Sequence, residues 1–163
     1  MIATATAYMQ VFATLDPSTV SSIQSENYKH EFAPASLNPP HPFTRETFAA
    51  HLTHLRKILR SFPVRFKQVW PNPSLNQVII WSDSETEFHG NVKDNDSEEE
   101  WKYKGEYIWV LTMDQGGGKV EHVLEFLDSK GTENLRGLMA RAFKKKEELD
   151  RHENEGVEEG WEY

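Results

Sequence analysis

Tyr107 and Glu125 lie in two segments that the sequence predicts to be neighbouring strands. Residues 101–113 and 119–128 are rich in β-branched and aromatic residues, and a glycine-rich turn separates them. In a hairpin centred on Gly116, Tyr107 faces Glu125 directly, with Cβ atoms roughly 5 Å apart. A slip of one residue would instead place the two side chains on opposite faces of the sheet.

One face of this hairpin would combine phenols, a carboxyl group and apolar side chains. The residues expected on it are Tyr103, Tyr107, Trp109, Val123, Glu125 and Leu127. Burial among apolar groups raises the pKa of a carboxyl group, so Glu125 could act as an acid or a base near neutral pH. A phenol can donate a hydrogen bond to an oxygen that gains negative charge. Alternatively, Glu125 and Tyr107 form a satisfied cross-strand pair without chemistry.

His30 is the further candidate for proton transfer. It lies in Tyr28–Leu37, a segment predicted to be extended, and its unperturbed pKa near 6.5 suits that role. It could equally be a core histidine bonded to the backbone. Lys29 would point to the other side of an extended chain, so only one of the two can enter a pocket. Phe32, from the same segment, is a candidate for substrate contact.

Tryptophans on successive predicted strands could form the wall of an apolar pocket. Trp81 and Trp109, together with Val123, are candidates for contact with a substrate, whereas Trp70 is expected in the core. All of these tryptophans could equally be core residues. Asp83, in the middle of a predicted strand, is a reserve acidic candidate.

His51 and His54 form an HxxH pair on a predicted helix, and the chain contains no cysteine. A metal site would need a third ligand from elsewhere, such as Asp83 or His89, and the spacing favours none. We therefore expect no metal, with His51 at the border of the apolar face of its helix. The missing thiols exclude a disulfide scaffold, a cysteine nucleophile and a thiolate zinc site.

Charge is distributed unevenly along the 163 residues, whose net formal charge is −8. Residues 147–163 hold eight of the acidic residues and one basic residue, which leaves residues 1–146 nearly neutral. A neutral body lacks the cationic surface that phosphate backbones need, so we expect no nucleic-acid partner. No apolar run approaches the roughly 20 residues that span a bilayer. We expect a cytoplasmic protein without a membrane partner.

Periodicity predicts an α+β domain over residues 1–146 and an acidic tail over 147–163, which is expected to be disordered apart from a continuation of the last helix. Apolar spacing indicates a helix in the first 15 residues, a short helix after Asp16-Pro17, a helix over 44–61 capped by Thr44, and a last helix starting near Thr132. Four consecutive strands, 64–70, 77–89, 101–113 and 119–128, imply a mostly antiparallel sheet. The helices before them would cover one face of it.

Two stretches carry a resemblance to a known family. The extended segment Tyr28–Leu37 and the hairpin end Val123–Ser129, which closes on Glu-Phe-Leu-Asp-Ser, follow a helix-rich first third. Over about residues 3–145 the chain resembles the NTF2-like superfamily, and within it the SnoaL-like isomerase and cyclase proteins of fungal natural-product biosynthesis.

The resemblance implies a cone-shaped fold, with helices packed on the concave face of a curved sheet and an apolar pocket open at one end. Similar members are cofactor-independent isomerases, cyclases or lyases, commonly homodimers through the outer sheet face. Residues of the type at Tyr103, Tyr107 and Glu125 line the pocket in such enzymes. Other members are transport or scaffold proteins without chemistry.

The resulting expectation is an isomerase or cyclase of secondary metabolism that acts on an oxygenated apolar small molecule. The substrate would be polycyclic, terpenoid-, polyketide- or alkaloid-like. Glu125 would move a proton, Tyr103 and Tyr107 would hold the oxygen where charge develops, and His30 would assist. A non-catalytic binding or dimerisation module is the alternative from a different class. A lyase that eliminates water would use the same residues.

Overall fold

The computed structural model describes the backbone of residues 1–158 and the side chains of residues 1–153. Its α-helices are α1 (Ile2–Thr14), α2 (Val20–Ile23), α3 (Arg45–Leu55) and α4 (Ser129–Glu158). Its strands are β1 (Gln24–Ala33), β2 (Leu59–Ser61), β3 (Val64–Asn72), β4 (Gln77–Phe88), β5 (Tyr103–Met113) and β6 (Val120–Leu127).

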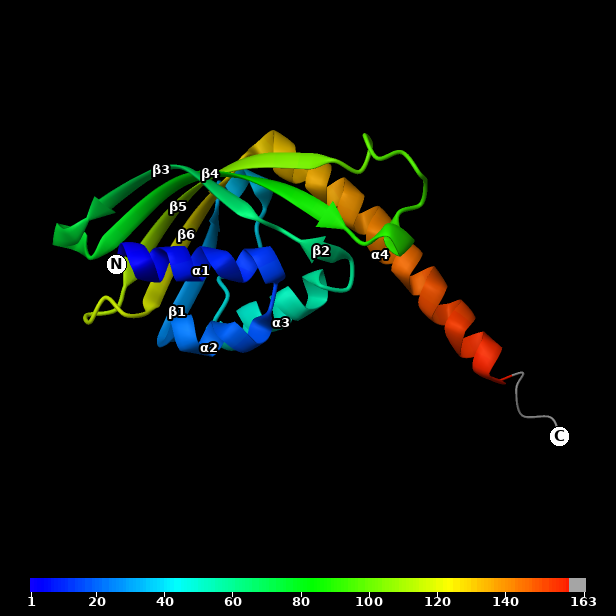
Figure 1. Ribbon diagram of the computed structural model, residues 1–163, viewed down its shortest axis with the longest axis horizontal. Helices are drawn as coiled ribbons and strands as arrows, with labels where there is room; N and C mark the ends of the chain where they lie inside the picture. The colour runs from blue at the N-terminus through cyan, green and yellow to red at the C-terminus, as the bar shows by residue number, and fades with distance from the viewer. Residues whose placement is uncertain (159–163) are drawn as a thin grey trace.

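The strands form one curved sheet in the order β1-β6-β5-β4-β2, with β3 also paired to β4. β1 runs parallel to β6 and the other pairs are antiparallel. Helices α1, α2 and α3 lie together on one side of this sheet, and α4 extends beyond the rest of the fold (Figure 1). The predicted α+β class, the mostly antiparallel sheet and the helix-covered inner face are therefore confirmed.

The inner face of the sheet faces the core. Side chains along β4 and β5 alternate between buried and more exposed positions, so each strand has one core side and one outer side. From α1, Tyr8 and Phe12 are buried, and from α3, Phe48 and Leu52. These apolar helix faces close the concave side of the sheet and bury its inward residues.

The β5–β6 hairpin differs from the predicted register by two residues. Trp109, rather than Tyr107, lies opposite Glu125, and Tyr107 lies opposite Leu127, so the predicted direct pair is wrong. The pairing is centred on Gly117, whose φ of 67° is a left-handed conformation that glycine adopts without steric cost. Because side chains alternate with a period of two, the shift leaves the predicted shared face intact.

The third helix is shorter than predicted. Thr44 caps α3 through the backbone N–H of Thr47, as expected, but the helix ends at Leu55. The chain then turns, and Leu59 pairs with Phe88 as part of β2. Leu59 continues the apolar spacing of the helix but is buried by strand pairing instead, a choice that periodicity alone does not reveal.

The last helix begins earlier than predicted and extends far into the acidic tail. Asp128, not Thr132, provides the cap, because its Oδ1 accepts hydrogen bonds from the backbone N–H groups of Lys130 and Gly131. α4 then continues without interruption to Glu158, so the expected continuation of the helix takes up residues 147–158 of the acidic tail. A Lys146–Asp150 ion pair, one helical turn apart, supports this extension. Residues 159–163 lie outside the described part of the chain.

Candidate functional site

His30 and Glu125 form a buried pair at the centre of the fold. Parallel pairing of β1 with β6 places these strands side by side, with Phe32 opposite Glu125. The His30 Nε2 atom lies 2.9 Å from Oε2 of Glu125. The two residues are 0% and 5% exposed, so the hydrogen bond is withdrawn from solvent.

Two buried tyrosines extend this pair into a chain of hydrogen bonds. The hydroxyls of Tyr8, from α1, and Tyr28, from β1, are 2.6 Å apart. Both lie near Nδ1 of His30, Tyr8 at 3.2 Å and Tyr28 at 3.1 Å. Each side of the imidazole ring therefore has a partner, which fixes the ring orientation.

Burial keeps this cluster uncharged. It raises the pKa of Glu125 well above its ordinary value, because the carboxylate would lose its hydration. Burial, followed by a smaller contribution from His122, lowers the pKa of His30 to about 3. Burial also raises the pKa values of Tyr8 and Tyr28. The pair is therefore a protonated carboxyl group beside a neutral imidazole.

One assignment of protons gives every hydroxyl and both imidazole nitrogens of the cluster a hydrogen-bond partner and leaves the Glu125 proton for a ligand. Tyr8 donates to Tyr28, Tyr28 donates to Nδ1 of His30, and the His30 Nε2–H donates to Oε2 of Glu125. The Glu125 proton then resides on Oε1, which makes no hydrogen bond to any residue of the described chain. This oxygen can meet a ligand.

A cavity of about 220 Å³ lies beside the pair. His30 and Glu125 line it, and most of its wall is apolar, with contributions from Phe32, Phe48 and Leu127. For scale, an engineered apolar cavity of roughly 150 Å³ accepts benzene. The site therefore combines an acidic group with an apolar cavity that is large enough for a ring system.

Tyr107 lines the same cavity, and its hydroxyl is 2.9 Å from that of Tyr103. Gly105 makes this contact possible: a Cβ there would lie 2.1 Å from the Tyr103 hydroxyl and 2.8 Å from that of Tyr107. Burial raises the pKa of both phenols, so both stay protonated. Tyr103 itself is not part of the cavity wall, so it reaches a ligand only through Tyr107.

Three predicted contact residues lie away from the cavity. Trp109 and Val123 are fully buried beneath the wall, and the Trp109 indole N–H donates to Oγ of Ser82 at 2.9 Å. Trp81 is on the outer sheet face, where its indole N–H donates to Glu106. The structure therefore corrects the prediction that these three residues line the substrate pocket. Trp81 points outward, and Trp109 and Val123 point inward but do not reach the cavity. Phe32 does line it.

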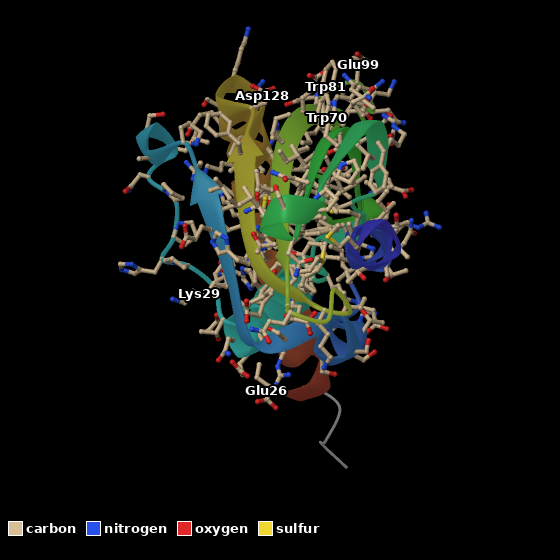
Figure 2. All side chains as sticks on the ribbon, turned by 90° about the vertical axis from the view of Figure 1, so that its left-hand side faces the viewer. Glu26, Lys29, Trp70, Trp81, Glu99 and Asp128 are labelled. Carbon is tan, nitrogen blue, oxygen red and sulfur yellow. The ribbon has the colours of Figure 1, made fainter. Side chains whose placement is uncertain are left out.

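Three further residues that the sequence singled out, Trp70, Asp83 and Lys29, also lie away from the cavity. Trp70, expected in the core, is 44% exposed. Asp83 is paired with Arg65 on the outer face. Figure 2 shows Lys29 pointing away from the fold at the outer side of β1, so His30 is the one that faces the cavity.

Of the HxxH pair, His51 lines the cavity and stacks on Phe43, whereas His54 stacks on Phe143. Within the described residues, no three His, Cys, Asp or Glu side chains are grouped so that they could hold a metal ion.

Sequence reasoning missed the tyrosines behind His30 and several polar groups of the wall. Tyr8 belongs to the apolar spacing that predicts the first helix. Because a buried phenol needs a hydrogen-bond partner, its hydroxyl indicates a polar contact inside the core. The polar wall residues that were not predicted are His51, Thr132 and Arg136. His51 was noted in the sequence only as part of the HxxH pair, and nothing in the local sequence of Thr132 or Arg136 distinguishes them.

Comparisons with known proteins find relatives of similar sequence and solved structures of similar fold. The austinoid biosynthesis clusters protein H of Penicillium brasilianum is 26% identical over 133 residues, which cover 79% of this chain and 83% of the relative. The structure of the BvnE pinacolase from Penicillium brevicompactum matches with a TM-score of 0.73 at 21% identity, covering 86% and 94% of the two chains. AusH from Aspergillus nidulans matches with a TM-score of 0.66 at 24% identity, covering 78% and 83%.

The predicted resemblance is thereby confirmed. The chain has the NTF2-like fold, and its relatives include proteins of fungal natural-product biosynthesis. No model of a known protein family matches it. Within the described residues, no helix is both long and apolar enough to cross a membrane.

The buried pair predicts a maximum in the pH dependence of stability. Between pH 4.5 and 6.5, the ordinary pKa values of the two groups, the unfolded pair holds one proton, as the folded pair does. Below this window the unfolded state takes up a second proton, which His30 refuses in the fold until about pH 3. Above it the unfolded state releases its last proton, which Glu125 keeps. The free energy of unfolding therefore decreases on both sides of this pH window, by up to about 1.4 kcal/mol per pH unit.

Urea unfolding of the wild type and of the double variant His30→Phe/Glu125→Leu, measured from pH 3.5 to 9, checks this. The difference in unfolding free energy between the two proteins should be largest inside the window and decline in both directions. Burial, followed by smaller contributions from His30 and His54, lowers the pKa of His51 to about 4. His51 is present in both proteins, so all of its contribution cancels except the part that comes from His30. A difference that only rises, or only falls, across the whole range contradicts a neutral pair.

Gly105→Ala should separate the two tyrosine hydroxyls. The new methyl group would collide with the buried ends of both rings, at a cost of about 1–3 kcal/mol in unfolding free energy. Gly90→Ala is the matched control, because nothing lies within 4 Å of a Cβ at that position. Equal stabilities of the two variants would show that the tyrosines can move apart without cost.

Proposed function

We propose that this chain is a cofactor-independent isomerase or cyclase, which acts by acid–base catalysis on an oxygenated apolar small molecule of secondary metabolism. One observation carries the proposal: Glu125, which lies 2.9 Å from Nε2 of His30 and whose pKa is raised by burial, lines an apolar cavity. The relatives named for austinoid biosynthesis and for pinacolase activity support the substrate class.

Glu125 would act first as the acid. It transfers the Oε1 proton to a substrate oxygen or carbon, and the carboxylate that results keeps the hydrogen bond from His30 Nε2–H. The charge is stabilised by a donor that is already in place. Glu125 then recovers a proton from another position of the substrate, so the enzyme ends as it began. Tyr107 donates a hydrogen bond to the oxygen where charge develops, and Tyr103 orients Tyr107.

Glu125→Gln should abolish turnover while keeping size and most hydrogen bonding. Acid–base catalysis contributes about 10²–10⁴-fold, so we expect a loss of at least 100-fold in kcat. The metabolite that accumulates in a strain lacking this gene supplies the substrate, and mass spectrometry follows the product. Glu26→Gln, which makes the same change at an exposed position of β1, is the control.

Undiminished turnover in Glu125→Gln refutes the mechanism. A product of unchanged mass identifies an isomerase or cyclase, and loss of one water identifies a lyase. No turnover by the wild type, with binding of the same metabolite, favours a non-catalytic binding protein.

We also propose that the chain forms a homodimer through the outer face of the sheet. Three large apolar side chains are exposed there, at 38–50% of their surface: Trp70, Trp81 and Phe126. Such a cluster on β3, β4 and β6 is costly to leave in water and is typical of an association surface.

Phe126→Glu should convert the dimer to a monomer, because it introduces a charge at the apolar face. The mass is measured by light scattering coupled to size-exclusion chromatography, at protein concentrations from about 1 to about 100 μM. This range covers dimers with dissociation constants in the micromolar range. Ile2→Glu, which alters an exposed apolar residue of α1, should leave the mass of the wild type unchanged. A wild type that is monomeric at every concentration contradicts the proposed interface.

A further inference from the structure

His51 is a titratable group of the cavity wall that makes no hydrogen bond to the described residues. His30, Tyr107, Glu125 and Arg136 also line the cavity, and each of them is hydrogen-bonded within the protein. Neither ring nitrogen of His51 has such a partner in the described part of the chain. Neither of them is sealed inside the protein either. A polar contact is therefore still open at this position.

One face of α3 directs His51 to the cavity. Phe48, His51 and Leu55 all line the cavity, and they follow one another in the helix at steps of three and four residues. Residues with this spacing lie on one face of a helix. Glu125 reaches the same cavity from β6, so the two side chains come from different layers of the fold. A ligand held between α3 and the sheet can contact both.

Phe43 fixes the position of His51 relative to the His30–Glu125 pair. The Phe43 ring stacks on His51, with 4.8 Å between the ring centroids. The Phe43 backbone pairs with His30, because the N–H of each residue donates to the carbonyl of the other, at 2.9 and 3.0 Å. These contacts hold the imidazole of His51 at a defined place, which lowers the entropy cost of binding a ligand there.

The imidazole of His51 is neutral at ordinary pH. Burial, followed by smaller contributions from His30 and His54, lowers the pKa of His51 to about 4. A neutral imidazole has one nitrogen that donates a hydrogen bond and one that accepts. A hydroxyl group suits either nitrogen, because it also donates and accepts, whereas a carbonyl group only accepts. An anion would lose its hydration here without gaining an opposite charge from His51.

We propose that His51 binds a hydroxyl group of the substrate, at a different position from the atom that Glu125 protonates. His51 is then a specificity-determining residue of the proposed reaction, and this inference rests on the proposed function. It narrows the substrate class, because the apolar skeleton must carry a hydroxyl group in addition to the group that reacts.

Four compounds of one skeleton test this contact. They are 1-tetralone and its 5-, 6- and 7-hydroxy derivatives, which place a hydroxyl group at different distances from the carbonyl group. Titrations followed by NMR compare the wild type with His51→Phe, which removes both nitrogens and keeps a ring to stack on Phe43. His54→Phe is the matched control, because His54 belongs to the same helix, stacks on Phe143 and is not part of the cavity wall.

We expect the wild type to bind at least one hydroxylated compound about 5- to 10-fold more tightly than 1-tetralone, the gain from one neutral hydrogen bond. His51→Phe should lose this preference and still bind 1-tetralone, and His54→Phe should keep the preference. Because each protein is compared with itself on two compounds, a general change in the shape of the cavity cancels.

The wild type provides a second readout, which serves if His51→Phe does not fold. In protein with isotope-labelled histidine, the ring nitrogen signals of His51 should shift more on addition of the preferred hydroxylated compound than on addition of 1-tetralone.

Four results would overturn the proposal: no hydroxylated compound binds the wild type more tightly than 1-tetralone, His51→Phe keeps the preference, His54→Phe loses it as well, or the His51 signals respond equally to all four compounds. These readouts are independent of turnover. An active Glu125→Gln would therefore refute the acid–base mechanism and leave the His51 contact standing, whereas failure of the contact would leave that mechanism untouched.

Discussion

The packing and protonation of the interior depend on the hydrogen bond between Glu125 and His30. An acid and a base buried together without water can exist as an ion pair or as a neutral pair. Removal of two charges from water costs several kcal/mol per ion, and mutual attraction repays it only with ample further hydrogen bonding. Here burial raises the pKa of one group and lowers that of the other, so the neutral form prevails.

This neutral pair demands a particular set of neighbours. His30 needs a partner on Nδ1, which Tyr28 supplies from the same strand, and Tyr8 reaches the pair from the first helix. The parallel β1–β6 contact then holds the imidazole against the carboxyl group. Three segments that are far apart in sequence must therefore pack correctly before the site exists. Such a hydrogen-bonded network tolerates little displacement, because each unpaired member would be costly.

The two sides of the sheet carry out different tasks with similar residues. On the inner side, aromatic rings surround the cavity and its acid. On the outer side, Trp81 is covered by Lys67 and donates to Glu106, an arrangement suited to a surface that is partly wet. Strand alternation separates these roles, so neighbouring residues of one strand belong to different surfaces.

The sequence by itself determined which residues of the β5–β6 hairpin share a face, because alternation has a fixed period of two. It therefore placed Tyr103, Tyr107 and Glu125 on one face even though the turn was displaced to Gly117. The cap of α3 at Thr44 was also readable, since capping is a local interaction. The extent of α4 was not, because a charged helix can be stabilised by pairs along its own surface.

Only the tertiary structure decided which inward residues reach the cavity. Trp109 and Tyr107 share a face, yet one is sealed in the core and the other lines the wall, since sheet curvature and helix positions determine the depth at each point. The partners of His30 were hidden for the same reason. Tyr8 reaches His30 from the first helix and Glu125 reaches it from the last strand, and no local pattern encodes contacts made across the whole fold.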